Sequence, residues 1–303
     1  MNEPEALTRQ SLTANGASDN DIRNSLRTGA LVVLARGIYL RRADYDALDQ
    51  AGRHRVRARF AGSRLGPDEA ISHVSAAVLH DLDIWKVPLT RVHVSRPRRS
   101  GRVTAHLHAH PTAWEEGDLV TVRGVAVTSV ARTVVDLART LPRDQAVSIG
   151  DSALRLHPNA GPQLARALER ARHRTGTTAA AAVLEFLDGR SESVGESLSR
   201  IRMRESGLPA PDLQREVVVR DGRRYRLDFF WDGHGIVGEF DGNIKYRDRR
   251  DLLAEKRRED ALRDLGLEVV RWKWAELDRF EVVAGRFARA VARARGRNAV
   301  SAR

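Results

Sequence analysis

The sequence Arg226-Leu-Asp228-Phe-Phe-Trp-Asp-Gly-His-Gly235-Ile-Val-Gly-Glu239-Phe-Asp241-Gly242 decides the fold of the C-terminal part of this chain. Its two ends are rich in apolar and aromatic residues, and the short Gly-rich segment Asp232–Gly235 separates them. This arrangement is typical of two antiparallel strands joined by a turn. We therefore expect a β-hairpin with strands over Tyr225–Trp231 and Ile236–Asp241.

The expected register of this hairpin sorts its side chains onto two faces. If Trp231 lies opposite Ile236, then Asp228 lies opposite Glu239, and successive side chains point to opposite sides of the sheet. One face is an apolar core face made of Leu227, Phe229, Trp231, Ile236, Gly238 and Phe240. The other face carries Arg226, Asp228, Phe230, Val237, Glu239 and Asp241. Stability alone gives no reason to place three carboxylates side by side, because they repel one another.

A divalent cation would relieve this repulsion, because Mg²⁺ (or Mn²⁺) prefers carboxylate oxygens and water as ligands. Asp228, Glu239 and Asp241 are therefore candidate metal ligands of a site that cleaves phosphodiester bonds. The alternative is an ordinary antiparallel hairpin whose outer face is solvated. The hairpin pattern alone leaves both interpretations open.

Composition narrows the class of protein. The 303 residues are 42% apolar and 30% charged, as in a soluble globular protein of one to three domains. The net charge of +12 favours a polyanionic partner such as DNA, although an arginine-rich chain also reflects a GC-rich genome. The absence of cysteine excludes disulfides, thiolate zinc sites and cysteine nucleophiles. Without a signal peptide or a long apolar run, we expect a cytoplasmic protein that does not enter the membrane.

The sequence predicts a mixed α/β protein in four segments, at residues 1–42, 43–190, 191–280 and 281–303. In the first segment, Pro4–Asn15 and Asp19–Arg27 read as helices, and Ser18 is the expected N-cap of the second. Two short strand-like runs around Arg36 follow. The order is typical of a winged helix-turn-helix domain, whose second helix faces the major groove of DNA.

The candidate DNA contacts of this first segment are Arg23, Asn24 and Arg27 on the second helix, with Arg36 on the wing contacting phosphate. The alternative is a small helical cap that makes protein contacts. In the mixed α/β middle segment, His73 and His80 share one face of the helix expected over Ala70–His80. His106, His108 and His110 alternate along a strand and share one of its faces, so a metal site is conceivable there, but a strand of this kind without a neighbouring acid is more often a surface strand. We interpret these histidines as packed or surface residues and assign them no ligand role.

After the polar connection Gly189–Gly195, the expected order is α-β-β-β-α-β. Its elements are a helix over Glu196–Glu205, a strand over Leu213–Arg220, the acidic hairpin, a helix over about Asp248–Leu265 and a strand over Leu267–Trp272. Residues 281–303 form a basic C-terminal helix or tail. We expect Trp231, Trp272 and Trp274 to pack in the core, although tryptophans can also stack on bases.

This order, with acids on its second and third strands, resembles the core of PD-(D/E)XK nucleases, and more closely their very-short-patch-repair-like endonuclease branch. The resemblance covers about residues 190–280 and rests on Glu196, Asp228, Glu239-Phe-Asp241-Gly242, Glu255–Glu259 and Leu267–Trp272. It implies that Asp228 is the metal-binding aspartate and Glu239 the second acid. Glu196, at the start of its helix, would orient water or a second metal ion, or would only stabilise the helix N-terminus.

Asp241 departs from the family pattern, because it stands where the family has its catalytic lysine. A carboxylate cannot stabilise negative charge that develops on the phosphate as an ammonium group can. Asp241 is then a third metal ligand, or the cation comes from Lys245 or Lys256. Lys256, Lys245 and Arg257 are also the candidates for neutralising DNA phosphates in this segment.

The N-terminal part resembles the winged-helix region of AbiEi-type antitoxins of abortive-infection systems. The residues that carry this resemblance are Leu7–Leu12, Gly16–Ser18, Gly29–Tyr39 and Val127–Ala138. It implies DNA binding and a link to phage defence or to a toxin–antitoxin pair. Three functions follow as hypotheses: a Mg²⁺-dependent DNA endonuclease, a catalytically inactive DNA-binding regulator or antitoxin, and a module that neutralises a cognate toxin or other defence protein.

Overall fold

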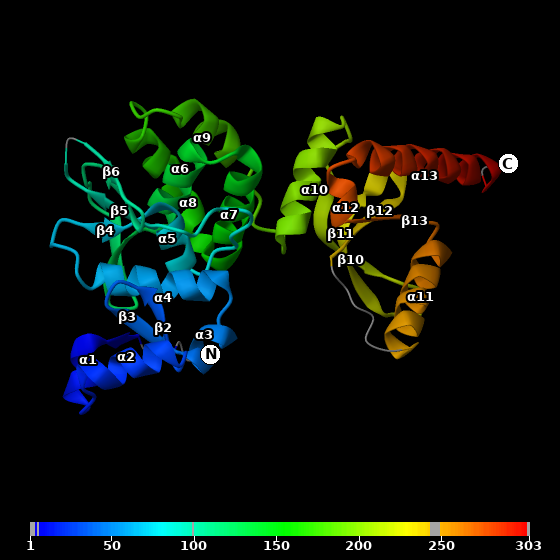
Figure 1. Ribbon diagram of the computed structural model, residues 1–303. Coiled ribbons are helices and arrows are strands. Elements are labelled where there is room, and N and C mark those ends of the chain that lie inside the picture. The colour runs from blue at the N-terminus through cyan, green and yellow to red at the C-terminus, as the bar shows by residue number, and fades with distance from the viewer. Residues whose placement is uncertain (1–3, 5, 99, 243–248, 302–303) are drawn as a thin grey trace. The chain divides into compact units, whose positions relative to one another are not determined.

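The protein is a mixed α/β protein with three β-sheets (Figure 1). The computed structural model describes residue 4 and residues 6–98, 100–242 and 249–301. The chain divides into two compact units, Met1–Leu187 and Asp188–Arg303, which are described separately below. Lys245, a candidate phosphate contact, lies outside the described residues. Within the described part of the chain, no helix has both the length and the apolar character needed to cross a membrane.

The first unit begins with a small three-stranded antiparallel sheet in the order β1-β3-β2. Its elements are β1 (Leu7–Thr8), α1 (Arg9–Ala14), α2 (Asp19–Arg27), β2 (Leu31–Ala35) and β3 (Ile38–Arg41). The predicted N-cap is confirmed, because Ser18 accepts a hydrogen bond from the Asp21 amide. The helix expected over Pro4–Asn15 is wrong in its first half. Leu7 and Thr8 pair with β3, and the Thr8 side chain caps α1.

The larger sheet of the first unit has six strands in the order β6-β7-β5-β4-β9-β8. The strands are β4 (Ala70–Ile71), β5 (Val92–Arg96), β6 (Arg102–Val103), β7 (Leu107–Pro111), β8 (Leu119–Val122) and β9 (Val125–Thr128). The helices are α3 (Arg42–Ala47), α4 (Gln50–Gly62), α5 (His73–Leu79), α6 (Val130–Thr140), α7 (Arg143–Leu156), α8 (Gly161–Arg170) and α9 (Thr177–Leu184).

One predicted helix of this unit, Ala70–His80, is also wrong at its start. Ala70 and Ile71 are fully buried and form strand β4, which pairs with β5 on one side and β9 on the other. A buried backbone must satisfy its amide and carbonyl groups, and here the neighbouring strands do so. Helix α5 therefore begins only at His73.

The second unit has the predicted α-β-β-β-α-β order, which is confirmed. Its elements are α10 (Val194–Glu205), β10 (Asp212–Val218), β11 (Arg224–Trp231), β12 (Ile236–Asp241), α11 (Arg249–Asp264), β13 (Glu268–Lys273), α12 (Trp274–Leu277) and α13 (Phe280–Ser301). The sheet order is β10-β11-β12-β13. Strand β13 runs parallel to β12, because the chain returns through α11 before it re-enters the sheet.

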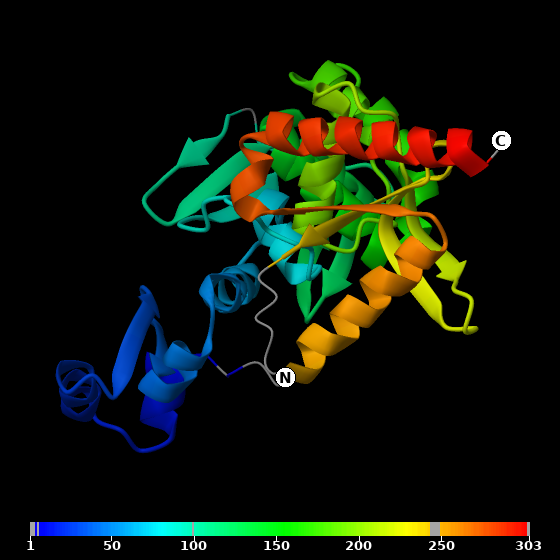
Figure 2. The ribbon, with the colours of Figure 1, turned by 90° about the vertical axis from the view of Figure 1, so that its right-hand side faces the viewer.

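The hairpin register predicted from the sequence is confirmed at the turn, where Trp231 pairs with Ile236 and Phe229 with Gly238. The solvated outer face considered as an alternative is wrong. Phe230 and Val237 lie on that face and are buried against Leu262 of α11. Figures 1 and 2 show α11 on one side of this sheet and α13 on the other. Both faces of the hairpin are therefore covered.

Aromatic side chains fill the opposite face, as expected. Trp231 packs on Phe287 and Trp272 packs on Phe280, both from α13. The core position of Trp231 and Trp272 is confirmed, since each is 5% exposed or less. The indole nitrogen of Trp272 donates a hydrogen bond of 2.8 Å to Ser199 Oγ, which ties α10 to the sheet.

Gly195 makes close packing of α10 possible. A Cβ atom at this position would lie 1.9 Å from Cε1 of Phe240. We expect Gly195→Ala to lower the free energy of unfolding of the second unit by about 1–3 kcal/mol, as overpacked cores do. Gly285→Ala on α13 is the matched control, because the nearest atom there is the flexible end of Arg289 at 3.5 Å. Calorimetric unfolding of both variants checks this, and equal stability of the two would contradict it.

Candidate functional site

Three carboxylates of the second unit come together from three different elements. Glu196 lies in the first turn of α10, Asp228 lies in β11 and Glu239 lies in β12. Glu239 and Glu196 are buried, at 4% and 8% exposure. We call these three residues the acidic cluster. Mutual charge effects link them, because Glu196 and Glu239 both raise the pKa of Asp228.

Asp228 is the residue whose ionisation the cluster affects most clearly. Burial above all, and then the nearby carboxylates of Glu196 and Glu239, raise its pKa to about 6, and one backbone hydrogen bond opposes them. That bond runs from the Phe240 amide to Asp228 Oδ2 at 3.0 Å. The Asp228 side chain thus bridges to β12 just beyond the last ladder pair, Phe229 and Gly238.

Glu239 is held by two arginines. Arg271 of β13 donates to its Oε2 at 2.8 Å, and Arg258 of α11 places Nη2 2.6 Å from its Oε1. The second contact is an ion pair without hydrogen-bond geometry, since the buried Oε1 accepts no hydrogen bond among the described residues. The parallel register explains the first contact, because it sets Glu239 beside Arg271.

Glu196 is fixed by hydrogen bonds to its own helix start and to β10. Its Oε1 accepts from Ser193 Oγ at 2.8 Å, and its Oε2 accepts from the Glu192 amide and from Gln214 Nε2, each at 2.9 Å. Ser193 is in turn the N-cap of α10. The carboxylate therefore stabilises the helix N-terminus and also faces Asp228, so both roles considered from the sequence are compatible with its position.

The remaining predicted site residues of this unit, among those that the structure describes, are Asp241, Lys256 and Arg257. Asp241 is half-buried at the end of β12, where its register partner on β13 is Lys273. Lys256 and Arg257 are exposed on α11. Sequence reasoning selected these two from the basic run of α11, but the residue that reaches the cluster is their neighbour Arg258. Arg271 was also missed; its only signal was its position in a strand that follows a helix.

The predicted metal ligands differ from the group with the tightest ligand geometry. Among the described residues, one group of three potential ligands brings its ligand atoms within 4.8 Å of one another, namely His73, His93 and His110 of the first unit. Asp228, Glu239 and Asp241 do not form such a group there. His73 and His110 were interpreted from the sequence as packed or surface residues, and His93 was not considered.

Three of the four DNA-contact candidates of the first unit are exposed on helix α2, and the fourth lies in a turn. Arg23, Asn24 and Arg27 are exposed on α2, while Ile22 points inward and is buried. Arg36 is exposed in the turn between β2 and β3. Arg23 and Arg27 stand four residues apart, so both guanidinium groups project from the same side of the helix.

The comparisons with known proteins give a family. No family model matches the chain. Two proteins of Mycobacterium tuberculosis do: "Uncharacterized protein MT2308" of strain CDC 1551 / Oshkosh and "Uncharacterized protein Rv2248" of strain ATCC 25618 / H37Rv. Each is 32% identical to this chain over 196 residues, which is 65% of this chain and 71% of the relative. The chain belongs to the family of these two mycobacterial proteins.

Among solved structures, the crystal structure of the RV2827C protein from Mycobacterium tuberculosis is similar to this chain. The matched region spans 71% of this chain and 83% of the RV2827C chain, with 16% sequence identity and a TM-score of 0.40. A likeness at that level defines no common site.

The raised pKa of Asp228 has a consequence for stability. Its ordinary value is 3.8 and its folded-state value is about 6, so the folded protein binds this proton more tightly. Without divalent metal, stability should fall as the pH rises from about 4 to about 6. Asp228→Asn removes this term, so its unfolding free energy relative to wild type should rise over that range by at most about 3 kcal/mol.

Urea unfolding of both proteins across that pH range, in chelator, measures the difference. Asp232→Asn, in the exposed turn after β11, is the matched control and should run parallel to wild type. An Asp228→Asn curve that also runs parallel to wild type would contradict the raised pKa.

Proposed function

We propose that the protein binds DNA and that its second unit is a PD-(D/E)XK-like, Mg²⁺-dependent phosphodiesterase of the endonuclease class. The observation that carries this proposal is the acidic cluster. Glu196, Asp228 and Glu239 meet although they come from a helix and two strands, and Asp228 is destabilised as an anion there. Stability of the fold does not require three carboxylates to meet, whereas the binding of a divalent cation does require carboxylate ligands.

The donor set fits a hard divalent ion. Asp228 and Glu239 would hold it, and the buried Glu239 Oε1, which accepts no hydrogen bond among the described residues, would coordinate it once Arg258, now 2.6 Å away, turns aside. The bound ion would supply a polarised phosphate and a more acidic water. Glu196 would hold or orient that water, while Arg258 and Arg271 would turn from Glu239 towards the phosphate backbone. Asp241 would be an additional or water-bridged ligand.

Because Asp241 stands in the place of the family's catalytic lysine, another side chain would have to supply the positive charge, and there are several candidates. Lys256 is exposed, and Lys245 lies outside the described residues. Arg258 already contacts Glu239, and Lys273 is the register partner of Asp241 on β13. An arginine near the scissile phosphate would neutralise charge there as the ammonium group of a lysine does.

The small domain of the first unit would provide DNA affinity as a winged helix-turn-helix. Its α2 would enter the major groove with Arg23, Asn24 and Arg27, and Arg36 of the β2–β3 turn would contact phosphate. The net charge of +12 supports a polyanionic partner. The cytoplasm is the compartment where such a protein meets DNA, and we propose it as the location.

A second function is a catalytically inactive DNA-binding regulator or antitoxin, with a cognate toxin or other defence protein as a further partner. The observation that favours it is the double pairing of Glu239 with Arg258 and Arg271. The guanidinium groups of these two arginines already neutralise the Glu239 carboxylate, so it does not need a metal ion for that purpose. Asp241 in the place of the family's lysine points the same way.

Cleavage of supercoiled and linear DNA by the full chain decides between the two functions. We expect cleavage with Mg²⁺ or Mn²⁺, none with chelator, and a loss of at least about 100-fold in rate for Asp228→Asn and for Glu239→Gln. Glu216→Gln, an exposed carboxylate of β10 in the same unit, should keep wild-type cleavage.

DNA that stays intact with either metal but is still shifted in chelator would leave the regulator as the function of the chain. Cleavage that survives Asp228→Asn would also overturn the nuclease proposal, because the activity would then belong to a contaminant or to another site.

The salt dependence of DNA binding tests the winged-helix proposal separately. Arg23→Ala combined with Arg27→Ala should lower the slope of log affinity against log salt concentration by about 2, because each guanidinium group in the groove displaces about one cation from the DNA. Arg166→Ala, exposed on α8 in the same unit, is the control and should leave the slope nearly unchanged. Fluorescence anisotropy with a labelled duplex measures it. A slope that the double variant does not alter would exclude this helix face from DNA contact.

A further inference from the structure

The larger sheet of the first unit brings three histidines together, two from its strands and one from the helix that follows β4. Val94 of β5 and Ala109 of β7 pack into the core with α4 and α5, so alternation turns His93 and His110 to the other face. Strands β5 and β7 are parallel neighbours, and β4 follows β5 in the sheet order. His73 begins helix α5 directly after β4. Three adjacent strands thus bring together residues that are far apart in the sequence.

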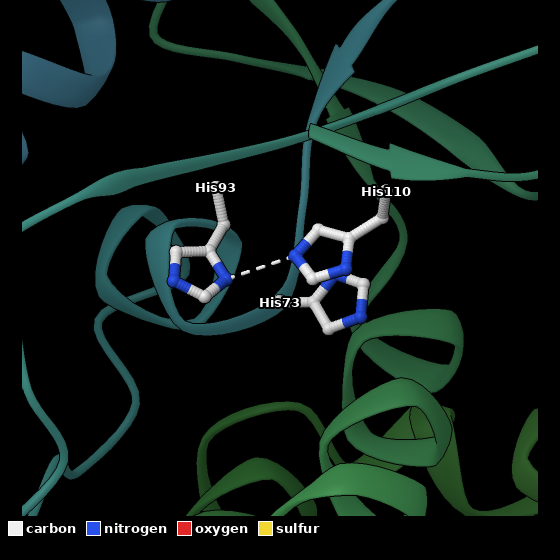
Figure 3. Close-up of side chains that lie close together, drawn as sticks. All are labelled: His73, His93 and His110. Atoms are coloured by element: carbon white, nitrogen blue, oxygen red, sulfur yellow. Dashed lines mark hydrogen bonds between the residues drawn. The ribbon is translucent and has the colours of Figure 1, made fainter. Parts of the chain in front are cut away.

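The ring nitrogens of these histidines converge. One nitrogen from each of His73, His93 and His110 lies within 4.8 Å of the other two. His93 Nδ1 and His110 Nε2 are 3.1 Å apart, and the ring of His73 is stacked on that of His110 with centroids 3.6 Å apart (Figure 3). Tetrahedral zinc with bonds of about 2.0–2.1 Å needs ligand nitrogens about 3.3 Å apart. To bind one ion, the stacked rings of His73 and His110 would rotate apart until both lone pairs aim at it, and the hydrogen bond between His93 and His110 would be replaced by bonds to the metal.

The surroundings hold one of the three rings, that of His73, as ligating imidazoles are held in metal sites. His73 is 7% exposed, and its Nδ1 lies 3.0 Å from Ser72 Oγ, which accepts a hydrogen bond from Ser95 Oγ at 2.8 Å. Such a bond to the second nitrogen fixes the orientation of a ligating imidazole. His73 also has a positive φ of 49°, which a non-glycine residue rarely adopts. Local sequence preference does not explain that conformation.

The charge state suits metal binding too. Burial and the neighbouring imidazoles lower the pKa of His93 and of His110 to about 3, and burial lowers the pKa of His73 well below its usual value. Burial thus disfavours the charged form of each ring, and it is the neutral form of imidazole that offers an unprotonated nitrogen to a metal. Packing alone would be served at lower desolvation cost by apolar side chains.

A cavity of about 630 Å³ borders the histidines on one side. Its lining includes His73 and His110 together with the arginines Arg98, Arg132, Arg139 and Arg174. Arg132 and Arg139 are ion-paired with Asp136, which also lines the cavity. Arg132 is also paired with the buried Asp118 at 2.6 Å. Four lining arginines against two carboxylates leave the cavity positive, so it suits an anion.

We propose that His73, His93 and His110 bind a transition-metal ion of the zinc class, and that an open coordination position faces the arginine-lined cavity, where a phosphate-bearing anion binds. Imidazole ligands select such ions over Mg²⁺, which prefers oxygen. This site lies in the first unit, separate from the acidic cluster of the second. It does not depend on the nuclease proposal.

Metal titration of the full chain, without a histidine tag and after chelator treatment, tests the metal part. We expect one Zn²⁺ per chain by calorimetry, and a visible absorption spectrum with Co²⁺ in its place. In His93→Asn an amide atom takes the place of Nδ1, and in His110→Gln an amide atom takes the place of Nε2. Both side chains can still form hydrogen bonds, but amides are poor zinc ligands. Each should weaken binding at least about 100-fold. His106→Gln, exposed just before β7, is the matched control and should bind as wild type does.

Circular dichroism of the variants confirms that the fold is retained, and thermal melts should show that Zn²⁺ stabilises the wild type but neither variant. A wild-type chain that binds neither Zn²⁺ nor Co²⁺ would overturn the proposal. So would equal affinities of wild type, His93→Asn and His110→Gln, or a loss in His106→Gln as large as theirs.

Inorganic phosphate tests the open position. Added to the Co²⁺-loaded protein, it should change the visible spectrum, and Arg174→Ala in the cavity should raise the phosphate concentration needed at least about 10-fold. Arg166→Ala on the exposed face of α8 is the control. A spectrum that phosphate leaves unchanged would mean that the metal site is closed and would overturn the anion part.

Discussion

The parallel pairing of β12 with β13 is the constraint on which the second unit depends. It requires a crossover, and α11 provides it, so the helix covers the face of the hairpin that the sequence pattern would leave to solvent. The same pairing sets Arg271 beside Glu239 and Lys273 beside Asp241. Each acid of β12 thereby gains a cationic neighbour. Without β13, Glu239 would be a buried charge with one partner fewer, and its desolvation would be strongly unfavourable.

Each unit of the protein holds one group of titratable side chains considered above, and the two groups differ in their chemistry. The acidic cluster presents carboxylate oxygens. Burial there disfavours the charged form of Asp228, and two arginines neutralise Glu239. The histidine group presents neutral nitrogens beside an arginine-lined cavity. Hard and borderline metal ions divide between such ligand sets by their donor preferences. The two proposed sites therefore do not compete for the same ion, and each can be tested alone.

Local patterns were sufficient for much of the second unit. Alternation and the Gly-rich turn gave both strands of the acidic hairpin and the register at Trp231 and Ile236, because turn length fixes pairing over short distances. The same reasoning failed at Ala70–His80 and at Pro4–Asn15. In both, short strands pair with residues distant in sequence. At Ala70–Ile71 the backbone is buried, and its need for hydrogen-bond partners outweighs local helix preference.

The sequence by itself determined the hairpin, the order of elements in the second unit and the presence of Asp228 and Glu239 on neighbouring strands, because these depend on periodicities within a few residues. Only the tertiary structure decided which partners the charges meet. It brought Arg258 rather than Lys256 to Glu239, and it brought His93 and His110 together with His73 across three strands. The histidines of one strand can be seen in the sequence, but the strand order that makes them neighbours cannot. That order results from packing distant segments into one sheet.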